Sequence, residues 1–64
     1  MALFFRVIEL GDDRWACRHG RLEYDTHPQV GQAIDHITAL AADHRPAELF
    51  LHRLDGSVAR LGTL

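Results

Sequence analysis

The first apolar run, residues 3–10, predicts a β-strand with apolar side chains on both faces. Phe5 and Val7 share one parity, and Phe4 and Ile8 share the other. A short run rich in aromatic and β-branched residues, closed by a turn signal, is typical of a strand. The turn signal is Gly-Asp-Asp at positions 11–13, because glycine admits positive φ and aspartate side chains bond their own backbone.

Two more strands are predicted before the middle of the chain. Residues 14–19 alternate, and Trp15 and Cys17 share the more apolar parity. The alternation predicts a half-buried strand with Trp15 and Cys17 directed inward. Gly20 interrupts this strand, and the alternation resumes over residues 21–24, which predicts a short third strand.

A helical period marks the middle of the chain. Apolar residues recur there at steps of three and four and fall within an arc of about 120°, which is one face of a helix. These residues are Val30, Ala33, Ile34, Ile37, Leu40 and Ala41. Thr26 and Gln29 fit a capping box at the helix start, Pro28 is tolerated in the first turn, and Pro46 ends the run.

The last part of the chain predicts a hairpin. Residues 48–54 carry apolar groups on both parities, and residues 57–61 form the return strand. Asp55-Gly56 between them predicts a two-residue type I′ turn, which needs positive φ at both positions. Residues 62–64 are expected to fray.

The element order is therefore β-β-(β)-α-β-β. It predicts a single α+β domain over residues 1–64, with an antiparallel sheet and one helix packed on one face. One helix covers only one face of such a sheet, yet the parities of Phe4, Ile8 and Phe50 or Leu54 direct these residues to the other face. A monomer rarely leaves a large apolar patch exposed. We expect a homodimer packed through the helix-free face; the alternative is that twist of the sheet buries these residues within one chain.

Composition bounds the class of protein. The chain has 64 residues, a net charge of −2, 47% hydrophobic and 25% charged residues, which is ordinary for a globular domain. A core of this size supplies roughly 3–5 kcal/mol, and a single cysteine excludes an internal disulfide. No apolar run approaches the ~18 residues of a membrane span. The first ten residues do not have the pattern of a signal peptide, so we expect a cytoplasmic protein.

The order of these motifs resembles the domain of unknown function family numbered 2188, a family of short bacterial proteins. The matching pieces are Val7-Ile8, Gly11-Asp12-Asp13-Arg14-Trp15-Ala16-Cys17, Asp25-Thr26, Ala33-Ile34 and His52-Arg53-Leu54-Asp55-Gly56. The likeness covers most of the chain, which departs from the family pattern in lacking lysine and in the helix start at residues 27–31. The resemblance implies the strand-helix-strand order and carries over no catalytic residue, because the family has no established chemistry.

The five histidines do not follow a metal-binding spacing. A zinc site needs three or four converging ligands, yet no histidine pair has the i, i+4 spacing of metal-binding helices, and Cys17 has no cysteine partner. His36 and His44 lie about 80° apart around the helix, so they would share a metal only across chains. We predict structural roles for the histidines, no metal ligand and no cofactor.

No catalytic residue is predicted. Cys17 shares the inward parity of Trp15, and a buried thiol in apolar surroundings is inert. Asp12 and Asp13 lie in a turn and the other carboxylates are scattered. A domain this small has little room for a pocket of ~300 Å³, so the protein is not expected to be an enzyme.

Arginines indicate the main alternative to a homodimer, which is binding of nucleic acid. Arg6, Arg14 and Arg18 have the parity opposite Trp15, so we expect them on the helix-free face. Some proteins bind single-stranded nucleic acid on a sheet that carries arginine and aromatic residues. The negative net charge weighs against this use.

The sequence therefore predicts a non-catalytic interaction module, dimeric through the helix-free face. The alternative is a small nucleic-acid-binding or regulatory protein that uses the same face. The candidate interaction residues are Phe4, Arg6, Ile8, Arg14, Arg18 and Phe50. No membrane partner and no small-molecule ligand is predicted.

Overall fold

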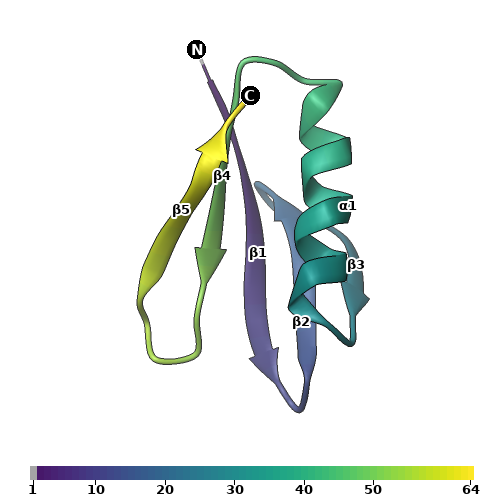
Figure 1. Ribbon diagram of the computed structural model, residues 1–64, viewed down its shortest axis with the longest axis vertical. Helices are drawn as coiled ribbons and strands as arrows, with labels where there is room; N and C mark the ends of the chain where they lie inside the picture. Colours follow the sequence, from purple (N-terminus) through teal and green to yellow (C-terminus); the bar gives the residue numbers. More distant parts are fainter. Residues whose placement is uncertain (1) are drawn as a thin grey trace.

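The computed structural model describes residues 2–64, which form a five-stranded sheet with one helix against it (Figure 1). The elements in chain order are β1 (Leu3–Gly11), β2 (Arg14–His19), β3 (Leu22–His27), α1 (Val30–Ala42), β4 (Ala47–His52) and β5 (Val58–Thr63). The predicted α+β class and element order, including the third strand, are confirmed.

The sheet is mixed, whereas an antiparallel sheet was predicted. The strand order is β3-β2-β1-β4-β5, and β1 pairs with β4 in parallel while all other neighbours are antiparallel. The reason is the connection through α1. Two successive hairpins leave β3 running in the direction of β1, and a parallel return requires a crossover of a dozen or more residues. Helix α1, with 13 residues, and the loops on either side of it supply that crossover.

The apolar stripe of α1 packs on one face of the sheet, as predicted. Ala33, Ile37 and Ala41 are fully buried, and so are Phe5 and Val7 of β1 beneath them. The helix contacts β1, β2, β3 and β4 but not β5. Within the described residues, no helix is long and apolar enough to cross a bilayer.

The start of the helix differs from the predicted capping box. Gln29 is the N-cap, and its side chain makes no capping hydrogen bond. Thr26 belongs to β3, where it pairs with Ala16 of β2. Pairing with β2 satisfies the backbone of this segment along a ladder, so the strand extends through Thr26 to His27 and the helix begins later.

The type I′ turn lies in the first hairpin rather than the last. Asp12-Asp13 has φ values of 53° and 55°, a conformation that aspartate tolerates better than most residues. In Asp55-Gly56 only the glycine has positive φ, at 88°. That hairpin closes with a 2.9 Å hydrogen bond from the Arg53 amide to the Ser57 carbonyl, which leaves a three-residue loop with glycine in the left-handed position.

The expected fraying of residues 62–64 is wrong. Leu64 exchanges two backbone hydrogen bonds with Ala47, of 2.8 and 3.0 Å, and its side chain packs against the core. The end of the chain therefore extends the β4–β5 pairing and closes that edge of the core.

The backbone at Gly31 and Gly56 predicts opposite effects for the same substitution. A Cβ at either position meets nothing within 4 Å, so packing does not separate them. Gly31→Ala in the helix should raise the free energy of unfolding by roughly 0.5–1 kcal/mol. Gly56→Ala should lower it by about 1 kcal/mol, because its φ of 88° is unfavourable for alanine. Urea unfolding of both variants measures the difference, and changes of equal sign would contradict the turn geometry.

Candidate functional site

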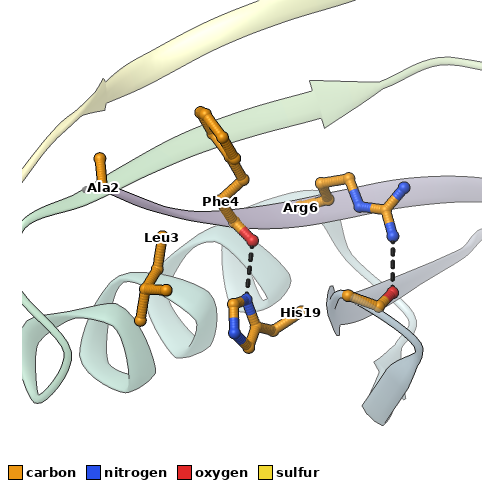
Figure 2. Close-up of a pocket in the computed structure, with 6 residues that line it drawn as sticks. Ala2, Leu3, Phe4, Arg6 and His19 are labelled. Atoms are coloured by element: carbon orange, nitrogen blue, oxygen red, sulfur yellow. Dashed lines mark hydrogen bonds between the residues drawn. The ribbon is translucent and has the colours of Figure 1, made fainter.

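The candidate interaction residues of β1 lie on the helix-free face. Phe4, Arg6 and Ile8 alternate with Phe5 and Val7, which are buried under α1. Figure 2 shows Phe4 on the side of β1 away from the helix, whereas Leu3 and His19 lie on the helix side of β1. Strand register extends the helix-free face to fourteen residues: Phe4, Arg6, Ile8, Arg14, Ala16, Arg18, Glu23, Thr26, Glu48, Phe50, His52, Val58, Arg60 and Thr63.

A row of neighbouring side chains crosses the middle of this face. Arg6 lies opposite Arg18 of β2 and beside Phe50 of β4, and Phe50 lies opposite Arg60 of β5. Like charges directly opposite one another destabilise a sheet unless other groups compensate them. Register therefore brings together arginines and an aromatic ring that are far apart in sequence.

The arginines of this row are compensated unequally. The Arg6 guanidinium donates to the Gly20 carbonyl at 2.8 Å, and Arg60 forms a 2.9 Å ion pair with Glu48. The Nε atom of Arg18 is buried and has no hydrogen-bond partner within residues 2–64. The site therefore holds an arginine donor that the described chain leaves unused.

Two phenylalanines are the aromatic part of the face. The rings of Phe4 and Phe50 contact each other with centroids 5.8 Å apart and planes inclined by 46°. Phe4 is 53% exposed, which is high for an aromatic side chain. Ile8 is half-buried, and Arg14 is exposed at the turn end of β2.

A hollow of about 420 Å³ adjoins this aromatic pair at the end of the sheet (Figure 2). Its lining residues are Ala2, Leu3, Phe4, Arg6, His19 and Gly20. It is larger than the size expected for so small a domain. Among the described residues, no carboxylate or thiol lines it. The imidazole of His19 donates a 2.8 Å hydrogen bond from Nδ1 to the Phe4 carbonyl.

Charge is divided unevenly between the helix-free face and the rest of the molecule. The face carries four of the seven arginines and two of the nine acidic residues, a net charge of +2. The remaining charged residues then carry −4, which together gives the −2 of the whole chain. The charge of the molecule is therefore asymmetric, and its net positive part lies on the helix-free face of the sheet.

A second group of side chains, on the other face of the sheet, was missed by sequence reasoning. The Cys-Asp-His-His cluster consists of Cys17, Asp25, His27 and His36, and one ligand atom of each lies within 4.8 Å of all the others. Cys17 comes from β2, Asp25 and His27 from β3, and His36 from α1. The prediction of no metal ligand stays untested, but the geometric reason for it, that no ligand set converges within one chain, no longer holds.

The cluster is held by short polar contacts. The His27 Nε2 atom lies 3.0 Å from Asp25 Oδ1, and His36 Nδ1 lies 2.9 Å from Asp25 Oδ2. The two ring nitrogens, His27 Nε2 and His36 Nδ1, are 3.2 Å apart. The Cys17 thiol donates to the Ala33 carbonyl at 3.3 Å.

Register explains why the cluster forms. Cys17 pairs with Asp25 and Trp15 pairs with His27, so all of these side chains lie on the helix side of the sheet. His36 follows the fully buried Ala33 by three positions, which places it at the edge of the stripe that packs on the sheet. The available sequence signal was Asp-x-His at positions 25–27, two ligand types on one face of a strand.

Burial changes the acidity of Cys17. It is fully buried, and this burial, together with the negative charge of Asp25, raises the pKa of the thiol from 9.0 to about 12. The predicted inward, unreactive thiol is consistent with this environment.

No protein-family model, curated protein or solved structure matches this chain. The resemblance to family 2188 therefore stays a prediction that rests on the residues quoted for it.

The environment of Cys17 predicts slow thiol chemistry in the folded, metal-free protein. With the pKa raised from 9.0 to about 12, the thiolate fraction below pH 9 is roughly a thousandfold smaller than for an exposed cysteine. Modification by a disulfide reagent in the presence of a chelator should be limited by unfolding and should become fast in urea. Rapid modification of the native protein would contradict this description of the site.

Proposed function

We propose that the protein binds single-stranded nucleic acid through its helix-free face. The observation that carries the proposal is the concentration of positive charge on that face, +2 against −4 for the rest of the chain. Neutralisation of phosphates by arginine supplies most of the affinity in such complexes. The proposed role involves no catalysis, and the free thiol favours a reducing cytoplasm as its compartment.

The row across the sheet supplies both kinds of contact that a single strand needs. Phe4 and Phe50 offer aromatic surface on neighbouring strands, where unpaired bases stack with little regard to sequence. Arg6 and Arg18 lie beside them, and a phosphate bound between these two guanidinium groups would offset their mutual repulsion.

The negative net charge, which weighed against nucleic acid in the sequence, has less force once its location is known. The two shorter dimensions of the molecule are 21 and 20 Å. Charges on the far side, such as those of Asp35 and Asp43 at α1, are therefore about two Debye lengths away at physiological salt and are largely screened. Asp12 and Asp13, by contrast, adjoin Arg14 at the edge of the face. A ligand at the sheet is attracted mainly by the charges nearest to it.

A homodimer through the same face is the second candidate. The exposed side chains of Phe4 and Val58, 53% and 54% exposed, favour a protein partner. Against it, a two-fold interface brings the same surface of both copies together. Two faces of net charge +2 would then oppose each other, which disfavours self-association relative to binding of a polyanion.

The proposal is tested with a labelled oligo(dT) strand and fluorescence anisotropy at about 50 mM salt. The wild-type protein should bind in a salt-dependent manner. Replacing Arg6 and Arg18 together by Gln should weaken binding at least tenfold and reduce the slope of log affinity against log salt by about 1.4. Phe4→Ala should weaken binding by about 1–3 kcal/mol.

The matched control is the double replacement of Arg21 and Arg45 by Gln. It removes the same charge outside the helix-free face, so it should leave affinity within about twofold. Equal losses in both double variants would assign the effect to net charge alone. Absence of wild-type binding at this salt would remove the proposal, and light scattering showing a dimer that Phe4→Arg dissociates would then favour the second candidate.

A further inference from the structure

We propose that the Cys-Asp-His-His cluster is a zinc site, in which Cys17, Asp25, His27 and His36 bind one Zn²⁺ and tie the helix to the β2–β3 hairpin. The site lies on the helix side of the sheet, so it is separate from the surface proposed for nucleic acid. It requires nothing from the function proposed above.

The chemistry of the four side chains fits zinc. A thiol sulfur, two imidazole nitrogens and a carboxylate oxygen are all ligands that Zn²⁺ takes, and structural zinc sites are closed by four of them. Thiolate and imidazole donors together disfavour magnesium and calcium, which prefer oxygen ligands.

The spacing of the donor atoms is close to that of a zinc tetrahedron. Two nitrogens bound to zinc at about 2.0–2.1 Å with tetrahedral angles lie about 3.3 Å apart. The His27 and His36 nitrogens are 3.2 Å apart, and the Asp25 oxygens lie 3.0 and 2.9 Å from them. The whole set, including the Cys17 sulfur, spans at most 4.8 Å, so small side-chain rotations suffice to enclose an ion.

Hydrogen bonding accounts for two of these three contacts but not for the third, between the two ring nitrogens. With Asp25 ionised, both rings must present N–H groups to it for the two carboxylate contacts to be hydrogen bonds. The same two nitrogens are 3.2 Å from each other, and two N–H donors cannot bond. If one ring gives up its proton to accept from the other, its lone pair then faces a carboxylate oxygen. A cation at the centre makes all three contacts favourable at once.

The surroundings of the cluster suit a structural ion. The Cys17 side chain is fully buried, and those of His27, His36 and Asp25 are 22%, 36% and 37% exposed. The ion would thus sit at the rim of the core, with a path from solvent on the outer side. Four protein ligands leave no position for a substrate, so the site stabilises rather than catalyses.

A metal ion that links these elements would stabilise a domain of this size. Only three elements contribute ligands, and they include α1 and the edge strand β3. Domains of this size often add a metal or disulfide because their cores are small, and this chain has one cysteine. Zinc binding would therefore stabilise the folded state over the unfolded one.

The test begins with full-length protein freed of metal by a chelator. Zinc titrated against a chromophoric chelator should show one ion per chain, and the melting temperature should rise with added zinc. Co²⁺ as a probe should give intense visible bands typical of tetrahedral coordination and a thiolate charge-transfer band in the near ultraviolet. Absence of stoichiometric binding by protein that circular dichroism shows to be folded would overturn the proposal.

Variants separate the cluster from adventitious histidine binding. His36→Gln should lower zinc affinity at least tenfold and abolish the zinc-dependent rise in melting temperature, whereas His44→Gln, outside the cluster, should leave both unchanged. Cys17→Ser should remove the charge-transfer band of cobalt. Equal losses in the His36 and His44 variants, or a wild-type cobalt spectrum without a thiolate band, would show that the ion binds elsewhere. Because His36 is partly exposed, its variant tests the site even if Cys17→Ser does not fold.

Discussion

The packing of one helix on one face of the sheet is the constraint on which the rest of the structure depends. The helix packs on β1 through five fully buried residues, which are Ala33, Ile37 and Ala41 of the helix and Phe5 and Val7 of the strand. With a single helix available, every side chain of opposite parity is left on the other face. The same contact therefore makes the core, aligns His36 with the β2–β3 hairpin, and leaves the helix-free face uncovered.

The parts of the fold that depend on local pattern were predictable. Alternation at Trp15 and Cys17 and the helical period from Val30 to Ala41 each report which side of one element is apolar. The parallel pairing of β1 with β4 was not predictable in this way, because no local pattern records which strands become neighbours. The capping box failed for a related reason: a ladder partner for Thr26, supplied by β2, competed with a local motif.

The two candidate sites also differ in how far local sequence pattern predicts them. The helix-free face was anticipated because parity along β1 and β2 is enough to place Arg6 and Arg18 on one side. The Cys-Asp-His-His cluster needed two further facts, the register of Cys17 with Asp25 and the direction in which α1 crosses the sheet. Spacing rules for metal motifs assume that ligands come in pairs on one element, and here only Asp25 and His27 do. Ligands contributed singly by different elements escape such rules.

The parallel pairing at the centre of the sheet also has a consequence for how the chain reaches this structure. Phe5 pairs with Leu49, so the middle of the sheet joins positions 44 residues apart in a chain of 64. Closing so long a loop lowers the conformational entropy of the chain before the stabilising contacts have formed. Proteins with such distant pairings fold in milliseconds to seconds rather than microseconds. The β1–β2–β3 meander can form early from near neighbours, but until β4 arrives one side of β1 remains an open hydrogen-bonding edge. The central strand of the finished sheet is thus the exposed strand of the nascent chain.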